Sequence, residues 1–239
     1  MKIIYSLFVW IIFGLMTAFL TVCGMPFVII GKNPFFMLAR LWSKISSKLF
    51  LVRYEVEGLE KIEPDKNYVF MGNHQSYVDI FSMISIIDKD FLFMAKRELF
   101  SIPFFGYAIK HMGLIPIDRG ESRESLKSLF DAAKKIQEGY SVLLFPEGTR
   151  SEDGVMLPFK RGAFTLAVRT GQQIIPFVID GSYKVMKKGA FIINPFRKVR
   201  IRFLDPVSPE GVKDREMLDI IRARMEDAQK ELGSIGAGK

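Results

Sequence analysis

The stretch "NYVFMGNHQSYVDIFSMISII", residues 67–87, places a buried strand directly before a polar turn and a helix. "NYVFMGN" is a short, nearly continuous apolar run, which is typical of a strand buried on both faces of a sheet. The residues from Val78 to Ile87 suit a helix. A strand followed at once by a helix is the unit from which α/β proteins are built, so this stretch sets the expectation for the chain around it.

Strands and helices alternate along the rest of the chain after Val52. Further strands are predicted in "YEVEG", "FLFMA", "GLIPIDR", "SVLLF", "IIPFVI" and "KVRIRFLD", and further helices in "IPFFGYAIKHM", 121–138, "RGAFTLAVRTG" and about 214–232. The helix over 121–138 has an apolar stripe that is expected to face the core: Leu126, Leu129, Phe130, Ala133 and Ile136. The alternation predicts one α/β domain over residues 51–239, with a central mixed, largely parallel sheet flanked by helices. The final "GSIGAGK" is expected to be a frayed tail.

The first thirty residues differ from the rest, because no charged residue occurs between Ile3 and Gly31. A bilayer core of about 30 Å needs about 20 apolar residues in a helix, and this run is long enough. It is also longer than the apolar region of a secretory signal peptide. We therefore expect a retained membrane segment, broken near its end by Gly24 and Pro26. The run could cross the bilayer or bend and dip into one leaflet.

The next segment, Lys32 to Phe50, mixes aromatic and aliphatic residues with Arg40, Lys44 and Lys48 at near-helical spacing. That composition is typical of an amphipathic helix at a membrane surface, although an ordinary core-facing helix would look similar. Residues 1–50 are thus predicted to form a membrane-anchoring helical segment. The positive flank favours the cell membrane, with the soluble domain on its cytoplasmic side.

Composition excludes several classes of protein. The single cysteine, Cys23, rules out a disulfide within the chain and a CxxC-type zinc site. No GxGxxG follows a first strand, and neither GxxxxGK[ST] nor GxSxG occurs, so nucleotide binding and an α/β-hydrolase nucleophile have no motif support. The net charge of +8 indicates an anionic partner. A nucleic acid is disfavoured, because much of the positive charge sits beside the membrane-seeking segments.

His74 and Asp79 are the first candidate for chemistry, since His74 comes just after the strand at 67–73. On a regular helix two residues five apart point about 140° apart, given 3.6 residues per turn. The pair can meet only if His74 lies in the turn before the helix and Asp79 lies in its first turns, where Ser76 could cap the helix. Asp79 would then fix the imidazole tautomer, and His74 could accept a proton from a hydroxyl. A histidine that merely packs near a strand end is as common as this arrangement.

Two further strand ends carry arginine. "LLFPEGTRSEDG" opens from a strand into a loop with Arg150, and "GLIPIDR" ends on Arg119. A guanidinium offers a planar fork that suits phosphate, although a single arginine at a turn is usually a solvated charge. A basic cluster between Gly181 and Leu204 could face a membrane, an acidic carrier protein or the phosphates of coenzyme A, or could be a solvated face.

Together these blocks resemble the glycerolipid acyltransferases. "NHQSYVD" matches their HxxxxD block, "GLIPIDR" is similar to the second block, "FPEGTRS" to the third, and "IIPFVI" with Pro176 to the fourth. The resemblance covers roughly residues 50–210, and four blocks in order are far more specific than HxxxxD alone. "FPEGTRS" points in particular to the enzymes that acylate 1-acyl-sn-glycerol 3-phosphate and form phosphatidic acid.

The resemblance implies a role for each block. His74 would be the general base for the sn-2 hydroxyl of lysophosphatidic acid, and Asp79 would orient it. The acyl donor would be a thioester of coenzyme A or acyl carrier protein, used as a co-substrate, with no cofactor and no metal. The glycerol phosphate would be bound by one group of residues: Arg119, Glu147, Gly148, Thr149 and Arg150. An apolar groove that includes "FLFMAKREL" with Lys96 would hold the acyl chain.

Three alternatives stay open at this point. The acceptor could be another lysolipid, or the protein could be a thioesterase or lysophospholipase that releases free fatty acid. A non-catalytic protein that binds or shapes membranes is the third. The expected partners are the bilayer, lysophosphatidic acid and the acyl donor, and no nucleic acid.

Overall fold

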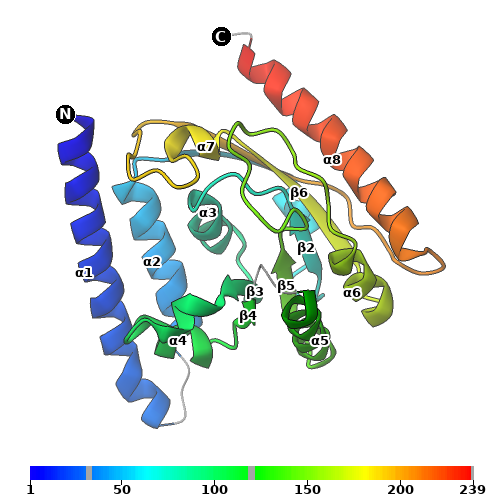
Figure 1. The fold of residues 1–239 in the computed structure, drawn as a ribbon, viewed down its shortest axis with the longest axis horizontal. Coiled ribbons are helices and arrows are strands. Elements are labelled where there is room, and N and C mark those ends of the chain that lie inside the picture. Colours follow the sequence, from blue (N-terminus) through cyan, green and yellow to red (C-terminus); the bar gives the residue numbers. More distant parts are fainter. Residues whose placement is uncertain (31–33, 118–121, 238–239) are drawn as a thin grey trace.

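The structure is a computed structural model, and it describes residues 1–30, 34–117 and 122–237. Seven strands form one sheet in the order β1-β7-β6-β2-β5-β3-β4 (Figure 1). Their bounds are β1 Arg53–Glu57, β2 Val69–Gly72, β3 Phe91–Lys96, β4 Ile115–Ile117, β5 Ser141–Leu144, β6 Ile174–Asp180 and β7 Lys198–Phe203. Every neighbouring pair is parallel except β6 and β7, which run antiparallel. The prediction of a mixed, largely parallel sheet is confirmed.

Helices cover both faces of the sheet because the strands alternate their side chains between two cores. On β2, Phe70 belongs to the core that includes helices α1, α2 and α3, whereas Met71 belongs to the core of α5, α6 and α8. The two sets of helices lie on opposite sides of the strands in Figure 1. The helix bounds are α3 Val78–Ile86, α4 Phe105–His111, α5 Ser122–Gln137, α6 Gly162–Thr170, α7 Ser182–Val185 and α8 Asp214–Ala237, with short 3-10 helices η1 Leu59–Lys61 and η2 Arg97–Ser101.

Helices α1 (Lys2–Ile29) and α2 (Phe35–Leu49) pack side by side against the domain (Figure 1). The predicted break at Gly24 and Pro26 is wrong, since α1 continues through both residues. Pro26 lies in the last turn, close to where the helix ends. Gly24 is buried, and a Cβ there would lie 2.5 Å from Cε1 of Phe35. Its small size lets the two helices approach closely.

The outer face of α1 is apolar along its length. Within the described residues α1 is the one helix that is long and apolar enough to cross a membrane, with a mean hydropathy of 2.3. Exposed large side chains occur from Ile4 through Phe8, Leu15 and Phe19 to Phe27. On α2 the buried side differs from a typical core face, because Ser43, Ser46 and Ser47 are buried together with Phe35. The exposed side of α2 carries Met37, Leu41 and Ile45 beside lysines.

Two finer predictions are wrong. Phe130 was expected in the core but is 62% exposed, because the buried side of α5 passes through the predicted Ile136 and through Ala132, which the predicted stripe left out. The buried Ser128 also lies on this side, and its hydroxyl donates to the carbonyl of Pro116. The expected frayed tail is helical as far as Ala237, and its last two residues lie outside the described part of the chain.

Candidate active site

The candidate residues gather at one edge of the sheet. Strands β6, β2, β5, β3 and β4 are mutually parallel, so their carboxyl ends meet at the same edge. The loop after β2 carries His74, the loop after β5 carries Glu147 and Arg150, and β3 ends on Lys96. In open α/β sheets this edge is where ligands bind.

The turn after β2 is fixed by the side chain of Asn73. Its amide Nδ2 donates to the carbonyl of Ile179 at 2.8 Å, and its Oδ1 accepts from the N–H of Ile179 at 2.7 Å. Asn73 thus continues the pairing between β2 and β6 with its side chain. The chain leaves the sheet after Asn73, and His74 is the first residue of the turn that follows.

Gly72 lets β2 approach Phe177 on β6. A Cβ at this position would lie 2.0 Å from the Phe177 ring, which is fully buried. We expect Gly72→Ala to lower the free energy of unfolding by roughly 1–3 kcal/mol, the usual cost of overpacking a core. Chemical denaturation would measure this against Gly233→Ala, where a Cβ meets nothing within 4 Å. Equal stability of the two variants would contradict the contact.

His74 and Asp79 are in hydrogen-bond contact. The imidazole Nδ1 lies 2.7 Å from Oδ2 of Asp79, and both side chains are buried. Because a carboxylate accepts, Nδ1 carries the proton and Nε2 is the basic nitrogen. The prediction that His74 precedes the helix and Asp79 lies in its first turn is confirmed, since α3 begins at Val78.

Asp79 is itself held by the turn that it supports. Its Oδ2 also accepts from the backbone N–H groups of Gln75 at 2.7 Å and Ser76 at 2.8 Å. The same carboxylate therefore orients the imidazole and satisfies donors before the first turn of α3. Ser76 was the predicted cap, but its hydroxyl donates to the carbonyl of Met186, and it accepts only a long 3.3 Å contact from the N–H of Val78.

The carboxylate of Glu147 forms a hydrogen bond with the backbone of His74. Its Oε1 accepts from the N–H of His74 at 2.9 Å, and its Oε2 accepts from the N–H of Leu157 at 3.1 Å. The N–H of Ser151 donates to the carbonyl of His74 at 2.8 Å, so the loop after β5 holds both backbone groups of the histidine. Burial raises the pKa of Glu147 to about 7, although the two N–H donors act to lower it.

The imidazole has an aromatic support. The ring of Phe145 stacks on His74 with 4.0 Å between centroids and 11° between planes. Phe145 in turn contacts Phe177 edge to face at 6.2 Å. With Asp79 at Nδ1 and Phe145 on one face, the orientation of the His74 ring is fixed from two sides.

Arg150 lies over the ring of Tyr77, with its guanidinium carbon 3.7 Å from the ring centroid. Its Nη1 is buried and makes no hydrogen bond with any residue that the structure describes. A buried cationic donor without a partner is costly unless an anion completes it. This arrangement suits a phosphate. The next residue, Ser151, donates its N–H to the carbonyl of His74, so the backbone of Arg150 lies close to the histidine.

Gly148 shapes the loop between Glu147 and Arg150. Its φ of +69° lies in the left-handed region, and its N–H donates to the carbonyl of Phe145. A Cβ there would lie 3.0 Å from Cε and Nζ of Lys160, so Lys160 covers this turn. Thr149 follows it, half-exposed.

Arg119 and Lys96 are the two remaining predicted site residues. Arg119 lies outside the described residues, so its position relative to His74 stays a prediction. Lys96 is exposed and forms an ion pair with Glu98 at 2.6 Å. Within the described ranges no group of three histidine, cysteine, aspartate or glutamate side chains is arranged to hold a metal ion.

Sequence reasoning missed three residues that build the site: Asn73, Gln75 and Phe145. Gln75 is fully buried, and its Nε2 donates to the carbonyls of Ile179 and Gly154, which ties the turn to β6 and to the loop after β5. All three act through contacts between distant segments. Asn73 and Gln75 could have been suspected because they flank His74 in the chain. No comparable signal in the sequence indicated Phe145.

Comparisons with known proteins identify the family of the chain. The model of the Acyltransferase family matches residues 53–180, which include both site loops. The crystal structure of the 1-acyl-sn-glycerophosphate acyltransferase PlsC from Thermotoga maritima superposes with a TM-score of 0.87 at 26% identity. The superposition covers 97% of this chain and 96% of the PlsC chain.

Curated relatives bear the same name. The 1-acyl-sn-glycerol-3-phosphate acyltransferase alpha of Mus musculus is 34% identical over 96% of this chain and 80% of its own length. The chloroplastic enzyme LPAT1 of Arabidopsis thaliana is 35% identical over 84% of this chain, which spans 58% of that relative's length. On the family model, the relatives and the shared fold, the chain belongs to the acyltransferase family, among the 1-acyl-sn-glycerol-3-phosphate acyltransferases.

Proposed function

We propose that the protein transfers an acyl group from an acyl thioester to the sn-2 hydroxyl of 1-acyl-glycerol 3-phosphate and forms phosphatidic acid. The observation that carries the proposal is the buried His74–Asp79 pair beside Arg150, whose Nη1 has no protein acceptor within the described structure. A base for a hydroxyl and a cation for a phosphate are what this acceptor requires. The names of the relatives support the same reaction.

In the proposed mechanism Nε2 of His74 takes the proton of the acceptor hydroxyl as its oxygen attacks the thioester carbonyl. The new C–O ester bond forms, the C–S bond breaks, and the thiolate leaves and takes the proton back from the imidazolium. Asp79 stabilises that imidazolium through Nδ1 while both groups are shielded from water. The step needs no acyl-enzyme, no metal and no cofactor.

The glycerol phosphate is proposed to bind at the loop after β5. Arg150 supplies the buried donor, and Thr149 offers a backbone N–H group near it, while the positive φ of Gly148 shapes the turn between them and Glu147. Arg119 is proposed as a second cation. Glu147 is proposed as a positioning residue and not as a ligand of the acceptor, because both of its oxygens already accept backbone N–H groups.

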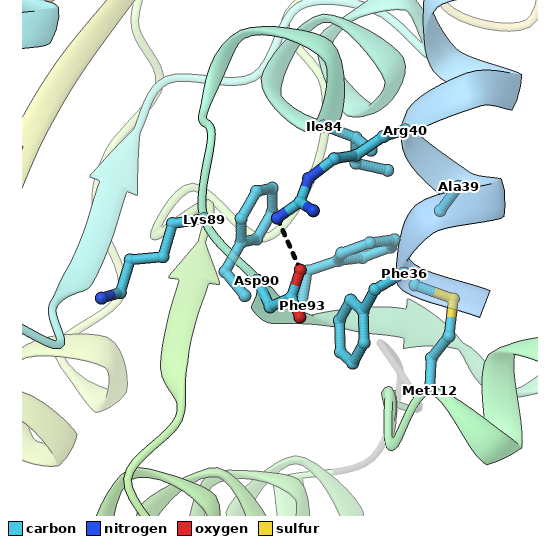
Figure 2. Close-up of a pocket in the computed structure, with 9 residues that line it drawn as sticks. Phe36, Ala39, Arg40, Ile84, Lys89, Asp90, Phe93 and Met112 are labelled. Carbon is cyan, nitrogen blue, oxygen red and sulfur yellow. Dashed lines mark hydrogen bonds and ion pairs between the residues drawn. The ribbon is translucent and has the colours of Figure 1, made fainter. Parts of the chain in front are cut away.

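The acyl chain is proposed to lie near β3. A mostly apolar pocket of about 10 Å³ between α2, α3 and the amino end of β3 is lined by Phe36, Phe93 and Met112 among others (Figure 2), and it would have to widen to hold an acyl chain. Two of its lining residues, Phe91 and Phe93, come from "FLFMAKREL". Arg40 and Asp90 also line it and form an ion pair at 2.6 Å. Lys96 stands at the end of the same strand, where its charge could meet the donor's polar part.

We propose that α1 and α2 place this site at the cytoplasmic surface of the cell membrane, with α1 in one leaflet. The contacts of α1 support this, because it packs along its length from Tyr5, whose hydroxyl donates to Leu49, to Gly24 against Phe35. A fully crossing α1 would carry the cations of α2 into the hydrocarbon. Charged groups at that depth are expensive.

The test is transfer of a labelled acyl group by the purified full chain in mixed micelles. Both acyl-coenzyme A and acyl carrier protein thioesters are offered, with lysophosphatidic acid, lysophosphatidylcholine or no acceptor. The proposal expects phosphatidic acid as the main product. Equal use of lysophosphatidylcholine would overturn the assigned acceptor, and release of free fatty acid without an acceptor would indicate a thioesterase or lysophospholipase.

Arg150→Ala is expected to lower kcat/KM for lysophosphatidic acid by about 10- to 100-fold, the value of one hydrogen bond to a charged group. Most of the effect should appear in KM, because the phosphate does not react. Arg169→Ala is the matched control, since Arg169 is exposed on α6. Steady-state kinetics at varied acceptor concentration would measure both. An unchanged KM in Arg150→Ala would remove Arg150 from the phosphate site.

A further inference from the structure

The segment between α7 and β7, residues 186–197, presents aromatic side chains to solvent; we call it the aromatic loop. Phe191 is 44% exposed and Phe196 is 64% exposed. Lys187, Lys188 and Arg197 are exposed on the same loop. The four blocks of the active site include none of these residues, and the reaction proposed above gives them no role.

The aromatic loop is fastened to the N-terminal half of α1. The indole N–H of Trp10 donates to the carbonyl of Phe191 at 2.9 Å, and the two rings stack with 6.2 Å between centroids. The N–H of Ile193 donates to the hydroxyl of Ser6 at 2.9 Å. Figure 1 shows the loop beside the start of α1. The loop therefore continues the surface of the helix that is proposed to lie in the membrane.

A second attachment joins the loop to the start of β1. The N–H of Phe196 donates to the carbonyl of Leu51 at 3.0 Å, and the N–H of Arg53 donates to the carbonyl of Arg197 at 3.0 Å. Leu51 and Phe196 both have positive φ, at 52° and 59°. A phenylalanine in the left-handed region is strained, and such strain is found where a function maintains it. Here the strained backbone displays a large apolar ring to solvent.

The charges of the region divide into two groups. Arg200 and Arg202 on β7 are paired with acids: Arg200 with Glu55 and Asp180, and Arg202 with Glu57 and Glu231. On the aromatic loop Lys188 is paired with Glu152 at 3.3 Å, whereas Lys187 and Arg197 form no ion pair with any acid in the described part of the chain. Lys187 and Arg197 on the aromatic loop are therefore available to an anionic partner.

We propose that the aromatic loop is a third membrane contact beside α1 and α2, with an anionic bilayer as its partner. Phe191 and Phe196 enter the boundary between headgroups and acyl chains, and Lys187 and Arg197 contact lipid phosphates. Exposed rings beside cations favour a lipid surface over an acidic protein, for which the cations alone would serve. The inference rests on the proposed membrane position of α1.

The test uses the full chain with Cys23→Ala, which leaves no other cysteine. Single cysteines are introduced by Phe196→Cys, Phe191→Cys, Leu15→Cys on the outer face of α1, and Phe130→Cys. Each is labelled with an environment-sensitive fluorophore and mixed with vesicles of phosphatidylcholine and phosphatidylglycerol. Phe130 is the matched control, because it is 62% exposed but lies on α5.

The proposal expects a blue shift, and quenching by brominated acyl chains, at positions 196, 191 and 15 but not at 130. A response at 15 without one at 196 and 191 would overturn the role of the aromatic loop and leave the position of α1 intact. No response at 15 would overturn the membrane position itself. A response at 196 to acyl carrier protein and none to vesicles would assign the surface to a protein instead.

Phe196→Asn adds a measurement of affinity, since asparagine tolerates positive φ and should preserve the backbone. Binding to the same vesicles is expected to weaken about tenfold or more, whereas Phe130→Asn should leave it unchanged. Lys187→Gln with Arg197→Gln should reduce the preference for phosphatidylglycerol over pure phosphatidylcholine. Equal binding by all of these variants and the parent protein would contradict the proposal.

Discussion

His74→Ala is expected to lower kcat by about a hundredfold to ten-thousandfold, the usual contribution of a positioned general base. Nε2 of His74 is the only nitrogen that the proposed reaction uses to accept the proton of the hydroxyl, and Asp79 is already committed to Nδ1. Substrate binding should change little, because Arg150 and the loop after β5 remain. The measurement is transfer of a labelled acyl group to lysophosphatidic acid, with acceptor concentration varied.

His74→Asn separates loss of the base from loss of structure. The asparagine amide can reproduce the donor of Nδ1 toward Asp79 but offers nothing at the position of Nε2. It should be as inactive as His74→Ala while it unfolds at nearly the temperature of the parent protein. His111→Gln is the control for the second histidine, whose Nδ1 contacts the carbonyl of Tyr107. Residual turnover near the parent value in His74→Asn would refute the base.

Much of the fold follows from local patterns in the chain. The apolar runs of β2 and β5 predict buried strands, and both are fully buried at the centre of the sheet. The position of β7 could not be predicted, because it pairs antiparallel with its chain neighbour β6 and also parallel with β1, whose residues are far from it in sequence. Phe130 fits a helical stripe as well as Ala132 does. Only the packing of α5 against its neighbours decides between them.

The site shows the same division between local and distant contacts. The spacing of His74 and Asp79 restricts their geometry to one arrangement, and the structure has that arrangement. The role of Glu147 could not be read from the chain, since its partners are the backbones of His74 and Leu157, up to 73 positions away. A carboxylate in a loop with Arg150 looks like a substrate ligand until those contacts are known.

Glu147→Gln is expected to reduce kcat on the order of a hundredfold with little change in KM for lysophosphatidic acid. An amide has one acceptor oxygen, so either His74 or Leu157 loses its partner and faces an NH₂ donor instead. A small displacement of a catalytic group has effects of this size. Glu152→Gln, exposed on the same loop, is the control. A selective rise in KM would instead return Glu147 to the acceptor site.

The same variant should remove a pH dependence of stability. The ordinary pKa of a glutamate is 4.5, and burial raises that of Glu147 to about 7. Between these values the folded protein binds a proton that the unfolded chain has released. The free energy of unfolding should therefore fall as pH rises from 4.5 to 7, by about 3 kcal/mol, and then level off. Denaturation curves across this range should show the decrease in the parent protein and in Glu152→Gln, and a difference from both in Glu147→Gln. If Glu147→Gln follows the parent curve, the decrease arises from another group, and the buried carboxyl of Glu147 is ionised throughout the range.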